Sequence, residues 1–417
     1  MKKIINSFLL NPFFTGSFVM IVGSNLVNVL NYVYHFIIGR LLGPANYGEL
    51  SALFSLIGML GIIPTSFGLV IVKTISSAKS KEETKGLISW FSKRILYLSL
   101  SMFLIVTIFS KSIASFLNIQ NYFLIIILGV MFLFSLSAFL NRSVLQGLLK
   151  FKETVASILA ENTIKLFLGI ILIFLGFSVA GAIVGVFCAT IVGWWITKSA
   201  LKDYKGIEKE ISPDQKKIFK FALPVLFYSF ASASLISTDL LLVKHFFSSY
   251  EAGVYAAVST LGKIIFFGTA PISSVMFPLV SKKNSTGDDS QKVFFYSLIL
   301  TVLISVVVVL IYILLPTLSV FALYGSRYAE AINYLGTYSI FIALYTTASL
   351  LVNYFLSLNK TKIVIVPLTA ALLQALGIWV YHKNLVEVIM VSIIVGLLLV
   401  LTLAFYYLLS YKSFKKV

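Results

Sequence analysis

The sequence predicts an all-α integral membrane protein with about 12 transmembrane helices, on the strength of three observations. First, 59% of the 417 residues are hydrophobic and only 12% are charged, and the mean hydropathy is +0.99. Soluble domains are usually about 45–50% apolar. Second, long apolar runs alternate with short polar segments along the whole chain. Third, Lys and Arg gather in every second one of those segments.

The apolar runs have the length that membrane-spanning helices need. Crossing about 30 Å of hydrocarbon takes about 20 helical residues, and only helices or closed barrels satisfy the backbone there. The runs are continuously apolar, which favours helices over alternating barrel strands. Six spans are expected in each half, near residues 13–39, 48–72, 90–110, 122–148, 153–175, 178–198, 221–246, 253–280, 293–316, 331–358, 362–381 and 387–410.

The distribution of charge predicts the orientation. Cytoplasmic loops of membrane proteins collect Lys and Arg, and the N-terminal end, the segment 198–220 and the C-terminal end are rich in them. Both termini are therefore expected in the cytoplasm, in a multi-pass protein of the cytoplasmic membrane. The net charge of +18 is explained by this topology and by anionic membrane lipids, so no nucleic-acid partner is expected.

Signs of processing or disulfide chemistry are missing from the sequence. Lys2 and Lys3 lead into the first apolar run without a small-residue cleavage site, so no secretory signal is expected. Cys188 is the only cysteine and lies inside an apolar run, which excludes an internal disulfide.

A weak internal repeat predicts two lobes. Gly48 and Gly253 match at an offset that also aligns Ala52 with Ala257. Two halves running in the same direction predict a parallel repeat with a pseudo-two-fold axis along the membrane normal. We expect a six-helix lobe over 1–200, a cytoplasmic linker with a short surface helix over 201–220, and a second lobe over 221–417.

Polar residues inside the apolar runs are the candidate functional groups. Asn25, Asn28, Tyr32 and His35 recur at spacings of three and four, so they share one helical face. That face is expected to meet either another helix or a wet cavity, because facing lipid is costly.

Charged residues within the spans are still more costly, at about 2.5–3.5 kcal/mol even on the mildest scale. Glu161 and Lys165 are four apart on one span, an order that favours an intrahelical pair. Asp239 and Lys263 are expected at similar depth on consecutive spans. Either these charges neutralise one another between helices, or Lys165 and Lys263, with Arg40, line a cavity for an anion while Asp239 or Glu161 takes up a coupling ion.

The sequence contains none of the common motifs for nucleotide binding, catalysis or metal binding. No phosphate-binding glycine loop, catalytic serine motif, metal-binding His-Glu-x-x-His sequence or cysteine pair occurs. We therefore expect no catalytic residues, no metal and no cofactor.

Three segments carry a resemblance to a known family. They are Gly39-Arg40-Leu41-Leu42-Gly43-Pro44 with Tyr47-Gly48, the Asp239 span leading to Glu251-Ala252-Gly253-Val254-Tyr255, and Met276-Phe277-Pro278-Leu279-Val280-Ser281-Lys282. In order and spacing, the chain resembles the polysaccharide transporter (Wzx-type) family of the multidrug/oligosaccharidyl-lipid/polysaccharide (MOP) flippase superfamily over essentially its full length.

The resemblance implies a MATE-like fold and a flippase that is not an enzyme. Such a carrier moves a polyprenyl-diphosphate-linked oligosaccharide to the outer leaflet by alternating access, coupled to H⁺ or Na⁺, and works with glycosyltransferases and a polysaccharide polymerase. It also implies cavity cations at Arg40, Lys165 and Lys263 and an acidic partner at Asp239.

Two other functions remain open from the sequence. A multidrug or metabolite cation antiporter of the same superfamily would favour acidic cavity residues, and the embedded charges here are balanced. A membrane glycan polymerase or ligase is less favoured, because the outer loops are short and no carboxylate cluster is present at either face.

Overall fold

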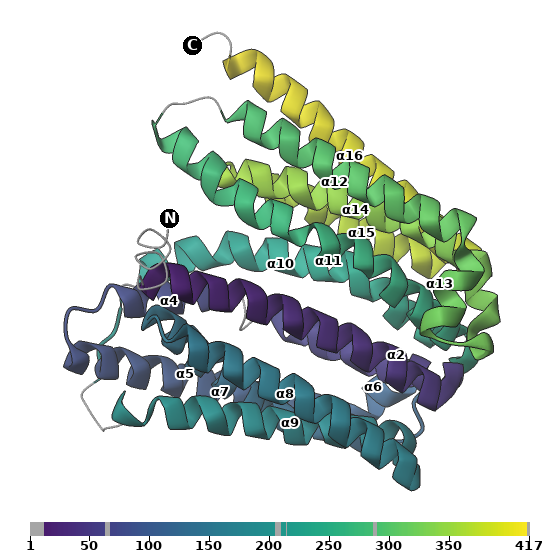
Figure 1. Cartoon of the computed structure of the whole chain (residues 1–417), viewed down its shortest axis with the longest axis horizontal. Coiled ribbons are helices and arrows are strands. Elements are labelled where there is room, and N and C mark those ends of the chain that lie inside the picture. The colour runs from purple at the N-terminus through teal and green to yellow at the C-terminus, as the bar shows by residue number, and fades with distance from the viewer. Residues whose placement is uncertain (1–11, 63–66, 205–209, 214, 287–289, 415–417) are drawn as a thin grey trace, which may run out of the picture. The chain divides into compact units, whose positions relative to one another are not determined.

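The computed structural model describes residues 12–62, 67–204, 210–213, 215–286 and 290–414, and these form helices joined by short turns (Figure 1). Within them, nine segments are long and apolar enough to cross a membrane. One of these, Phe151–Ala200, contains two of the expected spans in succession. The prediction of an all-α membrane protein is confirmed.

The described residues fall into two compact units, Met1–Leu42 with Gly61–Leu226, and Gly43–Leu60 with Phe227–Val417. The first contains the start of α2 (Pro12–Leu60) and then α4 (Gly68–Ser76), α5 (Lys81–Ile108), α6 (Ser110–Phe116), α7 (Phe123–Gly147), α8 (Phe151–Leu172) and α9 (Ser178–Ala200). Its α8 and α9 run side by side (Figure 1), and α7 packs on both α5 and α9.

The second unit contains the end of α2 and most of α10 (Gln215–Phe246). It continues with α11 (Ser249–Thr286), α12 (Gln291–Leu314), α13 (Pro316–Leu323), α14 (Ile332–Ser357), α15 (Ile365–Val380) and α16 (Leu385–Phe414). Helix α14 is its centre, because it packs against α11, α12 and α16. The lobe limits expected from the sequence stay a prediction, and what the structure adds is that residues 43–60 pack with the second unit.

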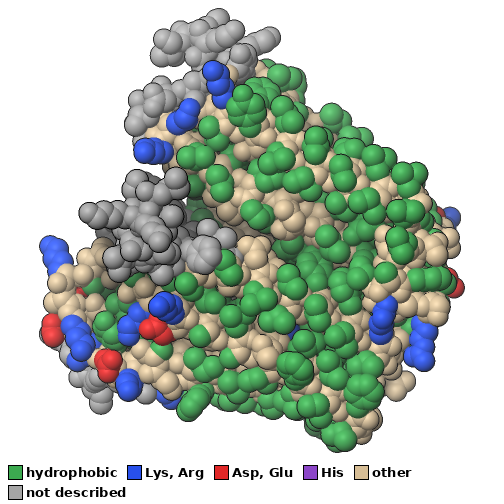
Figure 2. Space-filling view, viewed as in Figure 1, with side chains coloured by type: hydrophobic (Ala, Val, Ile, Leu, Met, Phe, Trp, Pro, Cys, Tyr) green, Lys and Arg blue, Asp and Glu red, His purple; other side chains and the backbone are tan. Residues whose placement is uncertain are grey.

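Apolar side chains face outward along the helices, as a lipid environment requires. Ile299, Leu303, Val306 and Leu310 are 49–59% exposed along one face of α12. On the face shown in Figure 2, hydrophobic side chains cover the sides of the helices and Lys and Arg side chains lie toward their ends. This distribution is that of a multi-pass membrane protein.

The segment after α9 is tied to the first unit where it is described. Glu210 pairs with Lys93 (Nζ to Oε1, 3.1 Å) and Arg94 (Nη1 to Oε2, 3.4 Å), and the N–H of Ile211 donates to the carbonyl of Gly86. The hydrogen bond from Lys93 lowers the pKa of Glu210 from its ordinary value. Residues 205–209 and 214 of the expected linker lie outside the described residues. In its described part, Lys202–Tyr204 forms a 3₁₀ turn and residues 215–220 are the start of α10.

Helix α2 spans two expected segments because it breaks instead of ending in a loop. Gly43 adopts φ 72° and ψ 173°, a conformation that side chains with a Cβ rarely reach. Pro44 follows, and its missing N–H and ring disfavour a continuous helix there. The helix axis can therefore change direction at Gly43, and the chain beyond it joins the second unit.

The residues that revealed the repeat lie against each other. A Cβ on Gly48 would fall 2.8 Å from the carbonyl oxygen of Ser249, and one on Gly253 would fall 1.7 Å from that of Pro44. The repeat offset that aligns Gly48 with Gly253 also aligns Pro44 with Ser249. This reciprocal contact is the signature of a two-fold relation between the crossing helices.

The crossing gives the first prediction. Gly253→Ala should destabilise the protein by at least about 1–3 kcal/mol, because the new methyl group would overlap the backbone of Pro44. The measurement is thermal unfolding in detergent, together with the yield of monodisperse protein. Gly268→Ala on the same helix is the control, since a Cβ there has no atom within 4 Å. Equal behaviour of the two variants would contradict the crossing.

Candidate functional site

The polar stripe predicted on the first span occupies one face of α2, but its members differ in exposure. Asn25 and Asn28 are exposed, whereas Tyr32 and His35 are half-buried. Tyr32 contacts the ring of Phe36 at 5.9 Å between centroids. Arg40, near the end of this helix, is exposed.

Lys165 is held by residues of α2. Its Nζ donates to Oδ1 of Asn31 and lies 4.7 Å from the ring centroid of Tyr34, which is fully buried. The ammonium group is thus stabilised by an amide oxygen and by an aromatic face. Neither Asn31 nor Tyr34 was predicted as a partner, because nothing in the sequence shows which part of α2 meets α8.

Glu161 pairs with a different residue from the one its spacing predicts. Its Oε2 accepts from Nη2 of Arg142 on α7, and Nε of Arg142 donates to Oγ of Ser157 at 3.0 Å. The expected intrahelical pairing with Lys165 is therefore replaced by an interhelical ion pair. The physical reason is that each of the two α8 residues binds a side chain of a neighbouring helix. Glu161 pairs with Arg142 on α7, and Lys165 donates to Asn31 on α2.

In the second unit, Asp239 is completely buried and accepts three hydrogen bonds. Oδ2 accepts from the hydroxyls of Tyr255 (2.8 Å) and Tyr338 (3.1 Å), and Oδ1 accepts from the N–H of Leu240 (2.8 Å). Because Tyr338 gives its only proton to Asp239, the hydroxyl of Ser259, 3.0 Å away, must donate to Tyr338. Helices α10, α11 and α14 are linked by this network.

Lys263 lies on α11, half-buried, in the same unit as Asp239. Within the described ranges it makes no ion pair with Asp239, whose oxygens are occupied by the tyrosines and the backbone. Lys244, a cation that is not among the candidate residues predicted from the sequence, is 0% exposed and donates to Oγ of Ser249 at 2.8 Å.

The predicted residues are divided between the two units. Arg40, Glu161 and Lys165 belong to the first unit, and Asp239 and Lys263 belong to the second. Their roles as cavity cations and coupling acids stay predictions. Among the described residues, no group of three or more His, Cys, Asp or Glu side chains could hold a metal ion.

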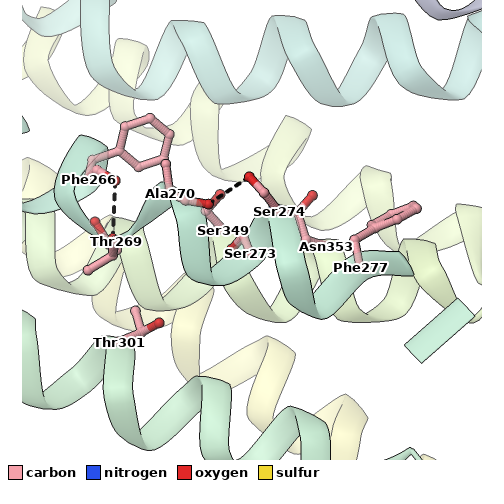
Figure 3. Close-up of a pocket in the computed structure, with 10 residues that line it drawn as sticks. Phe266, Thr269, Ala270, Ser273, Ser274, Phe277, Thr301, Ser349 and Asn353 are labelled. Carbon is pink, nitrogen blue, oxygen red and sulfur yellow. Dashed lines mark hydrogen bonds between the residues drawn. The ribbon is translucent and has the colours of Figure 1, made fainter. Parts of the chain in front are cut away.

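A cavity of about 310 Å³ lies within the second unit, between α11, α12 and α14 (Figure 3). Its lining consists of uncharged polar residues and a few apolar ones, namely Phe266, Thr269, Ala270, Ser273, Ser274, Phe277, Thr301, Thr346, Ser349 and Asn353. No sequence prediction covers this cavity, although Thr346, Ser349 and Asn353 recur at spacings of three and four and so share one face of α14.

These features define a multi-pass helical membrane protein with ionic and polar networks buried inside each unit. Residues 13–284 match the family described as polysaccharide biosynthesis protein. The match covers more than half of the chain, which therefore belongs to this polysaccharide biosynthesis protein family. It is also 28% identical over 290 residues to an uncharacterized membrane protein of Methanocaldococcus jannaschii, covering 63% of this chain and 67% of that protein.

Solved structures share the fold. An inward-facing multidrug resistance MATE family transporter of the MOP superfamily superposes with a TM-score of 0.78, covering 94% of this chain and 96% of its own at 14% identity. The lipid II flippase MurJ in an inward closed conformation superposes with a TM-score of 0.73, covering 94% of this chain and 87% of its own at 14% identity. The MATE-like fold expected from the sequence is confirmed.

The ion pair of the first unit gives the second prediction. Arg142→Ala should destabilise the protein by roughly 1–3 kcal/mol, less than the ~3–5 kcal/mol of a fully buried pair, because both side chains keep about a fifth of their surface exposed. Lys165→Ala should cost less, since Glu161 keeps its partner. A double-mutant cycle with Glu161→Gln checks this: a larger coupling to Lys165 than to Arg142 would contradict the observed pairing.

The carboxylate network of the second unit gives the third prediction. Tyr255→Phe and Tyr338→Phe should each lower stability by about 1–2 kcal/mol, because each removes a hydrogen bond to a buried carboxylate. Thermal unfolding of the single and double variants measures the effect, and the double variant should deviate from additivity because both hydroxyls share Oδ2. Tyr296→Phe is the control, since Tyr296 is 72% exposed.

Proposed function

We propose that this protein is a flippase that moves a lipid-linked oligosaccharide, a polyprenyl-diphosphate-linked repeat unit, from the cytoplasmic to the outer leaflet of the cytoplasmic membrane. The observation that carries the proposal is the match of residues 13–284 to the polysaccharide biosynthesis family. A second support is that the lipid II flippase MurJ has the same fold. In the proposed orientation both termini are cytoplasmic.

The physical task explains why a polytopic protein is needed. A headgroup of sugars and phosphates cannot enter hydrocarbon without losing its hydrogen bonds to water, whereas a polar cavity can replace them. The lipid tail stays in the bilayer throughout. Alternating access between two repeats then moves the headgroup across without opening a continuous pore.

The charged residues divide into two proposed roles. Arg40, Lys165 and Lys263 carry the positive charge that a diphosphate requires. Asp239 and Glu161 are the proposed sites where binding of H⁺ or Na⁺ changes the local hydrogen bonding, since each already joins two or more helices. The substrate is supplied by glycosyltransferases and consumed by a polysaccharide polymerase.

Export of cations is the second candidate, because a multidrug MATE transporter has the same fold. A cation site needs a carboxylate available to the ligand. Asp239 accepts two tyrosine hydroxyls and Glu161 pairs with Arg142, so an organic cation, which is larger than the proposed coupling ion, would have to displace these partners. This difference favours the oligosaccharide flippase over the cation antiporter.

The test uses proteoliposomes that contain a fluorescent polyprenyl-diphosphate oligosaccharide, whose exposure to an impermeant quencher is followed with and without a pH or Na⁺ gradient. Wild-type protein should accelerate transbilayer movement. Lys263→Ala should slow it by about ten- to hundredfold, the value of one charged hydrogen bond, and Lys263→Arg should retain it. Lys292→Ala, at an exposed position of α12, is the control.

Two results would contradict the proposal. One is a rate no higher than that of empty liposomes. The other is accumulation of ethidium, an organic cation, by the same vesicles under an imposed gradient, which would support the antiporter instead. Unchanged transport in both Lys263 variants would remove only the proposed role of that lysine.

A further inference from the structure

The turn that follows α14 in the second unit repeats the turn that follows α7 in the first. An offset of 210 aligns Lys150-Phe151-Lys152 with Lys360-Thr361-Lys362. The residue before each turn, Leu149 or Asn359, has φ 60°, and the first lysine has φ −83° with ψ 63° or 65°. The two units therefore present the same pair of lysines on the same backbone.

In both turns the first lysine lies over a tyrosine at the end of the last helix of its unit. Nζ of Lys150 is 5.5 Å from the ring centroid of Tyr204, and Nζ of Lys360 is 5.7 Å from that of Tyr406. The second turn connects two segments that can span a membrane, Ser326–Ser357 and Thr361–Val380. Its lysines and Tyr406 thus lie at a membrane surface, where cations and tyrosines are favoured.

The positive charge of the first turn is met by the protein itself. Lys150 donates to the carbonyl of Ala200 at 3.3 Å, at the end of α9. Glu153 follows the turn in the first turn of α8, and Asp203 directly precedes Tyr204. Acidic and carbonyl oxygens therefore lie near the lysines of this turn.

The second turn has no such acidic neighbours in the described part of its unit. On the described residues of α11, α12, α14, α15 and α16 the acids are Glu251 and Glu387, each in the first turn of its helix and so far from the end of α14. Lys362 is exposed and forms no ion pair with the described residues. Burial lowers the pKa of Lys360 from its ordinary value, so an anion beside it would stabilise its charged form.

Apolar stripes lead away from this turn along two helices. Ile365 and Leu372 are 62–63% exposed and seven residues apart on α15, so they share a face. Leu401, Phe405 and Leu408 are 55–63% exposed and share a face of α16 beside Tyr406. Helix α15 packs against α16 (Figure 1). Hydrocarbon chains that begin at the turn can therefore lie along these stripes.

We propose that Lys360 and Lys362, together with Tyr406, bind the headgroup phosphate of an anionic phospholipid of the surrounding bilayer. Both ammonium groups contact the phosphate, and the hydrocarbon chains lie along the stripes of α15 and α16. Basic pockets at the ends of membrane helices bind anionic headgroups in this way. In the proposed orientation the lipid belongs to the cytoplasmic leaflet, and the site does not depend on which substrate the protein carries.

The test uses the full-length protein in phosphatidylcholine bilayers that contain a trace of a lipid with a photoreactive diazirine near its headgroup, either phosphatidylglycerol or phosphatidylcholine. After irradiation, mass spectrometry measures the labelling of residues 358–366. Lys360→Gln/Lys362→Gln removes the two charges, and Lys360→Arg/Lys362→Arg keeps them. Lys150→Gln/Lys152→Gln is the matched control, because it removes the same charge from the equivalent turn of the other unit.

Phosphatidylglycerol should label residues 358–366 of the wild type about thirtyfold more than phosphatidylcholine, since each lysine near an anionic headgroup contributes about fivefold. The glutamine variant should lose this preference and label equally with both lipids. The arginine variant and the matched control should keep the preference within about twofold of wild type.

Four results would overturn the proposal. They are equal labelling of the wild type by both lipids, an undiminished preference in the glutamine variant, loss of the preference in the arginine variant, and an equal loss in the matched control, which would indicate diffuse attraction to all basic turns. Competition by inorganic phosphate separates the two sources of the anion. Labelling should persist in its presence, and its removal would indicate a site for a soluble anion instead of a lipid.

Discussion

The cost of an unsatisfied polar group inside hydrocarbon is the constraint on which the rest of this structure depends. It requires the backbone to be helical, and it requires every embedded charge to have a partner. The first unit meets it with an ion pair between α7 and α8 and with an amide and a ring around Lys165. The second unit meets it by placing two tyrosines on Asp239.

These networks join helices that are distant in sequence, so they serve packing as well as neutralisation. Asp239 connects α10, α11 and α14 through Tyr255 and Tyr338. Between membrane helices there is little hydrophobic driving force, and hydrogen bonds and close packing take its place. The crossing of α2 and α11 at Gly48 and Gly253 is the close-packed counterpart. A group that both fastens helices and can change its charge is well placed to couple an ion to a rearrangement.

Against this background the uncharged cavity is an exception. The same unit that satisfies Asp239 completely leaves Thr301 and Thr346 without partners among the described residues. The two hydroxyl oxygens have almost no accessible surface, so their missing hydrogen bonds are a cost of the packing between helices.

The sequence by itself determined the fold class, because helices are the only structures that continuously apolar runs of this length can form in a membrane. It also aligned Gly48 with Gly253 in one register, and the structure places these two glycines in contact. Which side chains meet was decided by the tertiary structure. The spacing of Glu161 and Lys165 is a local property of one helix, whereas Arg142, Asn31 and Tyr338 reach their partners through packing between helices. For the same reason the cavity required three helices to be placed together before its threonines, each an ordinary helix residue in the sequence, could form one surface.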